Sequence, residues 1–340
     1  MSRPVVRPLG FILTVLVAGA LVAIVVWPQL LGLHTALGFA QLVSFRALLA
    51  AALGVAAVIC AVIAFARRRV AVAAALAVVL AAGAAVGAGL LFERSDRSDA
   101  EAAASDLVVL AWNTERAGPG ADRIARLVAD EGADVVMLPE TGEADVDAVA
   151  DRLRADGLDY FADTTYGDRG EAETPTSVLI AAHLGEYALD EAAGSTPWLP
   201  SGVWRPVDGT GPVIVAAHPV PPVPWAMAMW RDGLSWLAAQ CTAGDTIVAG
   251  DLNATVDHLS GLGDHGVGVG RCRDAGSVAG GSAAGTWPTA LPVAWGTPID
   301  HVLAGDAWTV RDFRVVTSVD EAGSDHRPVV AVLTPTAPKG

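Results

Sequence analysis

Residues Thr246–Asn253 have the sequence TIVAGDLN, in which an apolar run is followed at once by an acid and an amide. Residues Asp134–Thr141, DVVMLPET, repeat this arrangement with a glutamate after the run. Strands that are buried on both faces appear as continuous apolar runs in the sequence. Polar side chains at the ends of such strands are how an α/β scaffold builds a functional site. The two segments therefore predict an α/β domain with a site at its strand ends.

Further apolar runs of strand length surround these two segments. We expect strands at 106–112, 177–181, 213–217, 299–303, 310–316 and 328–333. Helical spacing of apolar residues predicts helices at 122–130, 143–154 and 225–240. Strands with interspersed helices indicate sheets that are covered by helices. We assign this domain to residues 106–335, which is long enough to bury a substantial core.

Charge divides the chain into two parts. Residues 1–92 contain six arginines and neither Asp nor Glu. The chain has 22 basic and 37 acidic residues, so the remainder has 16 basic residues against all 37 acids, a net charge of −21. Hydrophobic residues make up 53% of the chain, which excludes a mainly disordered protein. The strong acidity argues against a basic protein that coats nucleic acid.

Three charge-free apolar runs, at about 9–27, 47–66 and 70–92, indicate a membrane anchor. Each has roughly the 20 residues that a helix needs to cross a bilayer core. A cleaved signal peptide is the alternative for the first run, but it fits poorly because two more runs follow. We therefore predict a domain over 1–92 with three transmembrane helices, and a linker over 93–105.

The arginines predict the orientation of this anchor. Arg3 and Arg7 precede the first run, and residues 67–69 are three arginines between the second and third runs. Positive residues stay in the cytoplasm, although Arg46 lies on the other side. We expect a multi-pass plasma-membrane protein with a cytoplasmic N-terminus and an extracytoplasmic C-terminal domain. Because disulfides persist outside the cytoplasm, we predict a Cys241–Cys272 bond, with two buried free thiols as the alternative.

Six polar motifs lie beside the predicted strands. They are Asn113-Thr114-Glu115, Pro139-Glu140-Thr141, His218-Pro219, Gly250-Asp251-Leu252-Asn253, Ile299-Asp300-His301 and Ser324-Asp325-His326-Arg327-Pro328. Such oxygen-rich sets suit Mg²⁺, Mn²⁺ or Ca²⁺ better than a structural zinc ion. The sequence has no Walker-type loop, no G-x-G-x-x-G after a strand and no G-x-S-x-G elbow. P-loop kinase, Rossmann and serine-hydrolase functions therefore have no motif in their favour.

In this order the six motifs resemble those of the endonuclease/exonuclease/phosphatase superfamily, over roughly residues 106–335. The N-terminal anchor is similar to that of a bacterial membrane-anchored branch. The resemblance implies a DNase I-like four-layer α/β sandwich, here preceded by the three transmembrane helices. It also implies hydrolysis of phosphoester bonds with Mg²⁺ or Mn²⁺. One departure is Pro139, since Gln usually precedes the metal-binding Glu in the family.

The resemblance also assigns roles to nine residues. The metal ligands would be Asn113, Glu115, Glu140 and Asp325, and the catalytic residues His218, Asp251, Asn253, Asp300 and His326. Asp251 would orient or deprotonate the attacking water, and Asn253 would hold the phosphate. His326 would bind or protonate a phosphate oxygen, with Asp300 accepting a hydrogen bond from it. His218 would contact the phosphate or the leaving group, whereas a direct role for His301 stays open.

These observations predict a membrane-anchored, metal-dependent phosphoesterase that acts on phosphodiesters or phosphomonoesters outside the cytoplasm. Tight binding of a polynucleotide draws on Lys and Arg, so the acidic domain favours a small or lipid phosphodiester. An extracytoplasmic nuclease acting on DNA or RNA is one alternative, and a non-catalytic lipid- or partner-binding member of the fold is another. The expected partners are the phosphoester substrate and the lipid bilayer, with no obligate protein partner.

Overall fold

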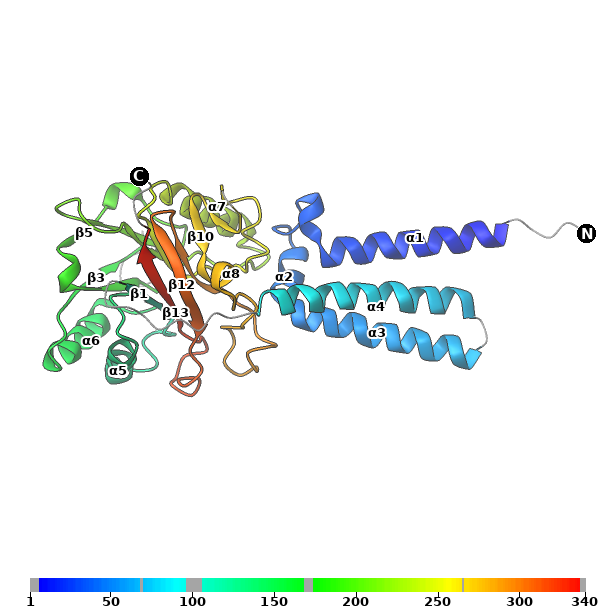
Figure 1. Cartoon of the computed structure of the whole chain (residues 1–340), viewed down its shortest axis with the longest axis horizontal. Helices are drawn as coiled ribbons and strands as arrows, with labels where there is room; N and C mark the ends of the chain where they lie inside the picture. The colour runs from blue at the N-terminus through cyan, green and yellow to red at the C-terminus, as the bar shows by residue number, and fades with distance from the viewer. Residues whose placement is uncertain (1–5, 68–69, 96–105, 168–173, 265, 337–340) are drawn as a thin grey trace, which may run out of the picture. The chain divides into compact units, whose positions relative to one another are not determined.

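The computed structural model describes residues 6–67, 70–95, 106–167, 174–264 and 266–336 (Figure 1). The chain divides into two compact units, Met1–Glu93 and Arg94–Gly340. The first is helical and the second is α/β. Arg3, Arg68, Arg69 and residues 96–105 of the predicted linker lie outside the described residues.

The first unit consists of helices α1 (Val6–Val26), η1 (Pro28–Leu31), α2 (Phe39–Ser44), α3 (Arg46–Arg67) and α4 (Val70–Glu93). Small residues let α4 pack closely against its neighbours. A Cβ atom at Gly83 would collide with Val22 of α1, and one at Gly87 would lie 3.1 Å from the Ala50 Cβ of α3. The buried Arg46 donates a hydrogen bond to the Val26 carbonyl at the end of α1, 2.9 Å away.

Two of these helices could cross a membrane by length and composition. Within the described residues they are Arg46–Ala66, with a mean hydropathy of 2.8, and Ala71–Glu93, with a mean hydropathy of 2.3. The prediction of three spans is therefore met by only two helices. The apolar segment Gly10–Val26 of α1 is shorter than these two helices.

In the described part of the second unit, the strands form two mixed sheets. The six-stranded sheet has the order β12-β13-β1-β2-β4-β3, and the seven-stranded sheet has the order β5-β6-β7-β8-β11-β10-β9. The strands of the first sheet are β1 (Leu107–Ala111), β2 (Val135–Pro139), β3 (Tyr160–Thr165), β4 (Thr176–Ala181), β12 (Trp308–Val315) and β13 (Val329–Pro335). Those of the second are β5 (Tyr187–Leu189), β6 (Gly202–Pro206), β7 (Ile214–Ala217), β8 (Ile247–Asp251), β9 (Gly268–Val269), β10 (Cys272–Asp274) and β11 (Asp300–Ala304).

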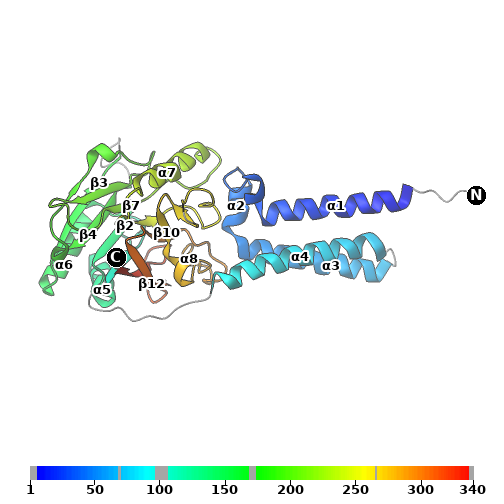
Figure 2. The ribbon, with the colours of Figure 1, turned by 45° about the horizontal axis from the view of Figure 1, so that its top comes forward.

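The two sheets pack face to face around a core that includes Val109, Met137, Ile214 and Val302. Helices α5 (Ala121–Glu131) and α6 (Glu143–Ala155) cover the outer face of the six-stranded sheet, where a second core forms. Figure 2 shows α7 (Met227–Gln240) beside the other sheet, and α8 (Ala275–Ala279) follows β10. The predicted α/β class with two helix-covered sheets is confirmed. Helices η3 (Ala182–Leu184) and η4 (Glu191–Ala193) are short connectors.

The predicted disulfide is present. Cys241, which directly follows α7, is bonded to Cys272 at the start of β10, with 5.8 Å between their Cα atoms. Both residues are fully buried. The bond therefore ties the end of a covering helix to β10, the strand next to the edge strand β9 of the seven-stranded sheet.

Removing this bond should destabilise the second unit by about 3–4 kcal/mol, since it closes a loop between residues 31 apart in the sequence. The measurement is chemical unfolding of the full chain in detergent, with the Cys241→Ala/Cys272→Ala variant compared against the oxidised wild type. Cys60→Ala is the control, because Cys60 is the free cysteine among the described residues. Equal stability of the double variant and the wild type would contradict the prediction.

The start of the predicted linker packs against the second unit. The guanidinium of Arg94 makes two hydrogen bonds to the carboxylate of the buried Asp257, at 3.0 and 2.9 Å. The carbonyl of Arg94 also accepts a hydrogen bond from the Gly281 amide, at 2.9 Å. Arg94 is therefore tied to the α/β unit through both its side chain and its carbonyl group.

Candidate active site

Both sheets end in polar residues at the same edge of the sandwich. Strands β1 and β2 are parallel, so Asn113 and Glu140 follow neighbouring strand ends. Strand β13 is antiparallel to β1, with Val329 opposite Ala111, and this pairing brings the preceding His326 to the same edge. In the other sheet, β7 and β8 are parallel and Asp300 of the antiparallel β11 lies opposite Asp251. The topology therefore collects motifs that lie far apart in the sequence.

Three of the collected residues have left-handed backbone conformations. The φ angles are 47° at Glu115, 60° at Glu140 and 47° at Asn253. Residues other than glycine rarely adopt this region, and when they do they cluster at functional sites. Pro139 pairs normally with Thr176 at the end of β2, so the unusual proline leaves the strand intact and the turn occurs at Glu140 itself.

Asp251, Asp300 and His326 form a buried cluster. Nδ1 of His326 lies 2.9 Å from Oδ2 of Asp300, and Nε2 lies 3.7 Å from Oδ2 of Asp251. One ligand atom from each residue lies within 4.8 Å of the others. Oδ1 of Asp300 is buried with no hydrogen-bond partner among the described residues. The cluster therefore has an acceptor atom that is free to bind a further group.

The charges of this cluster perturb its titration. Burial raises the pKa of Asp251 to about 7, although the positive His326 opposes the shift. Burial alone would lower the pKa of His326, but the carboxylates of Asp300 and Asp251 raise it to about 10. At neutral pH, His326 is thus an imidazolium and Asp251 titrates near the pH at which a general base is most effective.

His218 lies beside the cluster and is neutral. Burial, together with the positive charge of His326, lowers the pKa of His218 to about 3. Its Nε2 is 3.7 Å from Oε1 of Glu140, and its backbone amide donates to Oγ of Ser201 at 2.8 Å. A neutral imidazole in this position can donate one hydrogen bond to a substrate oxygen.

Two asparagines hold Asp251 in place. Nδ2 of Asn113 lies 3.1 Å from Oδ2 of Asp251 and also 3.1 Å from Oε1 of Glu140. The backbone amide of Asn253 donates to Oδ1 of Asp251 at 2.8 Å, and its Nδ2 lies 3.3 Å from Oδ2. Asn113 therefore connects the buried cluster to the more open Glu140.

Glu115 and Asp325 complete the group on its solvent side. The backbone amide of Asp325 donates to Oε2 of Glu115 at 3.0 Å, and Oδ1 of Asp325 is 3.8 Å from Nε2 of His326. The side chains of Glu140 and Asp325 are 24% and 43% exposed, so their carboxylates are open to solvent. The nine residues singled out in the sequence thus form one connected group at this edge.

This group fits a divalent cation that prefers oxygen ligands. It offers several carboxylates and an amide without any thiolate, the donor set of Mg²⁺ or Mn²⁺ sites. The unpartnered Oδ1 of Asp300 is a further acceptor. A cation is therefore compatible with the residues present.

Two supporting residues were not predicted from the sequence. Nε1 of Trp287 donates to Oδ2 of Asp325 at 2.7 Å. Oγ of Ser324 donates to the Asn113 carbonyl at 2.7 Å and accepts from the His326 amide at 3.0 Å. Ser324 belongs to the motif Ser324–Pro328, which marks its position in the sequence, whereas Trp287 lies in a loop outside the six motifs.

Residues 110–326 match the family model described as the endonuclease/exonuclease/phosphatase family. The chain belongs to this family. The match covers the strand ends that carry all nine site residues. No curated protein matches the sequence.

Solved structures agree with this family assignment in fold. An endonuclease/exonuclease/phosphatase protein from Beutenbergia cavernae DSM 12333 is 22% identical with a TM-score of 0.52, and the match covers 68% of this chain and 72% of that one. TDP2 from D. rerio, solved with a single-strand DNA product, is 16% identical with a TM-score of 0.51, over 68% of this chain and 99% of that one. The DNase I-like fold of this family member is therefore established.

The metal-free protein should lose stability as the pH rises from about 6.5 to about 10. Folding raises the pKa of Asp251 from 3.8 to about 7 and that of His326 from 6.5 to about 10. The folded state then binds more protons than the unfolded state across this range, and its stability declines with pH. Chemical unfolding in EDTA, followed by tryptophan fluorescence, measures the slope. Asp251→Asn should flatten it, and a wild-type stability that rises with pH would contradict the prediction.

Proposed function

We propose that this family member is a membrane-anchored, divalent-metal-dependent phosphoesterase that hydrolyses phosphodiester or phosphomonoester bonds outside the cytoplasm. The observation that carries the proposal is the contact of Asp251 with both asparagines beside the His326–Asp300 pair. This arrangement supports a mechanism in which a base, amide donors and an imidazolium act around one point.

Asp251 is the proposed base. Its carboxylate takes a proton from water as the water oxygen attacks phosphorus, and the bond to the leaving oxygen breaks. Its pKa of about 7 suits this transfer at neutral pH. Asn113 and Asn253 fix its orientation through their hydrogen bonds, so it needs no rearrangement during the reaction.

The histidines are the proposed phosphate ligands. The imidazolium of His326 is oriented by Asp300 and donates to a phosphate oxygen from Nε2. The neutral His218 adds a second donor. Preorganised donors of this kind stabilise the charge that develops on the phosphate oxygens.

Glu140, Asn113, Glu115 and Asp325 are the proposed ligands of a bound Mg²⁺ or Mn²⁺. When bound, such an ion neutralises phosphate charge and polarises the bond to phosphorus. Both Glu115 and Glu140 have left-handed backbone conformations. Trp287 holds the remaining carboxylate, that of Asp325.

A small or lipid phosphodiester is the proposed substrate class. Residues 93–340 carry a net charge of −21, and tight binding of nucleic acid needs free Lys and Arg. Several arginines of the α/β unit are paired with acids: Arg205 with Asp190, Arg271 with Asp306 and Arg314 with Glu131. This pairing removes much of the positive charge that a polynucleotide would contact.

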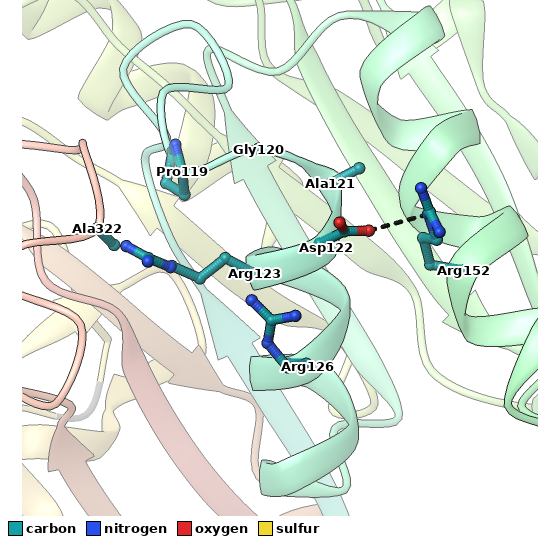
Figure 3. Close-up of a pocket in the computed structure, with 8 residues that line it drawn as sticks. All are labelled: Pro119, Gly120, Ala121, Asp122, Arg123, Arg126, Arg152 and Ala322. Carbon is teal, nitrogen blue, oxygen red and sulfur yellow. Dashed lines mark ion pairs between the residues drawn. The ribbon is translucent and has the colours of Figure 1, made fainter.

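A nuclease is the second candidate, and one surface feature favours it. Arg123, Arg126 and Arg152 line a hollow of about 550 Å³ at the start of α5 (Figure 3). Only Arg152 is paired with an acid of this hollow, Asp122, at 2.9 Å. The hollow also touches Pro119 and Ala322, on the loops that lead to Glu115 and Asp325. An extended anionic substrate could contact it from the active site.

The proposed location follows from the anchor and the disulfide. Two helices are apolar enough to cross a membrane, and the three arginines between them, residues 67–69, favour a cytoplasmic connection that leaves the following α/β unit outside. The Cys241–Cys272 bond is typical of an oxidising, extracytoplasmic compartment. The lipid bilayer would then be a permanent partner of the enzyme.

The test is hydrolysis by the full chain in detergent with Mg²⁺ or Mn²⁺. Bis-p-nitrophenyl phosphate, plasmid DNA and phospholipid are assayed in parallel, with EDTA and Asp251→Asn as negative controls. Asp208→Asn, at an exposed turn, is the matched control that should stay active. Preference for phospholipid or the small ester supports the proposed substrate class, and preference for plasmid supports the nuclease. A folded chain that turns over none of them contradicts the proposal and favours a binding role.

A further inference from the structure

A second buried histidine lies next to the site and faces away from it. His301 follows Asp300 in β11, and successive side chains of a strand point to opposite faces. Asp300 contacts His326, whereas the imidazole of His301 contacts Asp274 and the carbonyl of Ala254. His301 is 2% exposed, so these contacts are shielded from water.

Both ring nitrogens of His301 face an acceptor. Nδ1 is 2.7 Å from Oδ2 of Asp274, and Nε2 is 2.8 Å from the oxygen of Ala254. A backbone carbonyl can only accept a hydrogen bond, so Nε2 carries a proton and donates it. The other carboxylate oxygen of Asp274 accepts from the Ser277 amide at 2.7 Å, which fixes the carboxylate.

Ala254 ends the segment that carries Asp251 and Asn253. This segment includes the left-handed Asn253, and a strained backbone persists only where its surroundings hold it in place. Its consecutive peptide groups are held separately: the Leu252 amide donates to Ile299, the Asn253 carbonyl accepts from Trp230, and the Ala254 carbonyl accepts from His301. His301 thus holds the Ala254 end of this turn.

We propose that His301 is a positioning residue that holds the Asp251–Ala254 turn in its reactive geometry through the hydrogen bond from Nε2 to Ala254. The inference rests on the proposed function, because the turn supplies the proposed base. Asp274, at the end of the disulfide-bonded strand β10, fixes the other side of the ring. The contact acts on Asp251 only through the backbone.

Two conservative variants of His301 distinguish a positioning role from a role in stability alone. The amide nitrogen of His301→Gln can replace Nε2 and keep the bond to Ala254, but it leaves Asp274 without its partner. The amide nitrogen of His301→Asn can replace Nδ1 and keep the bond to Asp274, but it does not reach Ala254. We therefore expect His301→Gln to be the more active variant and His301→Asn to be the more stable one.

The experiment uses the full chain in detergent, with bis-p-nitrophenyl phosphate and Mg²⁺. We expect His301→Asn to lower kcat by about tenfold or more with little change in KM, as for a change that misplaces a catalytic group. His301→Gln should keep more of kcat while unfolding at a lower temperature. Hydrogen exchange should increase at residues 252–255 in the Asn variant more than in the Gln variant.

The outcomes distinguish this inference from the proposed function. If kcat and exchange follow thermal stability in both variants, His301 has only a structural role and the inference is overturned. If the wild type hydrolyses none of the assayed esters, the proposed function fails, whereas the exchange data still decide whether His301 holds the turn. If a variant is not recovered folded, NMR of ¹⁵N-histidine-labelled wild type replaces it. A slowly exchanging Nε2 proton on His301 supports the inference, and its absence overturns it.

Discussion

Asp251→Asn should lower kcat for phosphoester hydrolysis by about 10³-fold or more. General-base catalysis contributes about 10²–10⁴-fold, and an amide cannot take the proton of the attacking water. Asparagine has nearly the same shape as aspartate, so it can still accept a hydrogen bond through its side-chain oxygen, for example from the Asn253 amide. The loss should therefore be in kcat rather than in folding, and steady-state kinetics with Mg²⁺ on the small ester measures it.

Asp208→Asn is the control for this prediction. The same chemical change is made there at an exposed turn, and kcat should not change. Thermal unfolding of both variants shows whether each is folded at the assay temperature. An Asp251→Asn variant that keeps kcat within about tenfold of wild type would assign the base to another residue.

Removal of the divalent metal should abolish hydrolysis, and Glu140→Gln should raise the metal concentration needed for half-maximal activity by about 100-fold or more. Loss of a group that merely supports a ligand already weakens metal binding by about 10–100-fold, and Glu140 is the proposed ligand itself. The measurement is a titration of EDTA-treated protein with Mg²⁺ and Mn²⁺.

Glu143→Gln is the matched control, because Glu143 lies three residues further on, at the start of α6, and belongs to no part of the site. Its metal titration should match that of the wild type. Full activity in excess EDTA would contradict metal dependence. An unchanged titration for Glu140→Gln would instead move the metal to other residues, such as the Asp251, Asp300 and His326 cluster.

Much of the fold was predictable because its central strands are continuous apolar runs. Strands β1, β2, β4, β7, β8, β11, β12 and β13 all lie within or beside the predicted ranges. The peripheral strands were missed for local reasons. For example, β6 begins with Gly202 and ends with Pro206, both unusual in strands, and it forms because Trp204 is fully buried in the core between the sheets.

The site was predictable to the extent that its residues lie in motifs at strand ends. Glu140 directly follows the buried strand β2, and His326 lies three residues before the buried strand β13. Contacts between separate loops correspond to no motif in the sequence. Trp287 reaches Asp325 across 38 residues of sequence, and His301 reaches Ala254 across 47 residues. Only the three-dimensional packing of the loops brings these pairs together.

The pairing of β1 with β13 determines when the candidate site can form during synthesis of the chain. In the six-stranded sheet, Leu107 of β1 pairs with Leu333 of β13. The first strand of the α/β unit can therefore form this pairing only after its last strand has been synthesised. Contacts this distant along the chain form slowly, and the incomplete sheet exposes unpaired edges in the meantime. Asp325 and His326 lie three to four residues before β13, so a nascent chain whose apolar helices are already synthesised still lacks a complete site. The candidate site is therefore complete only after the ribosome has finished the domain.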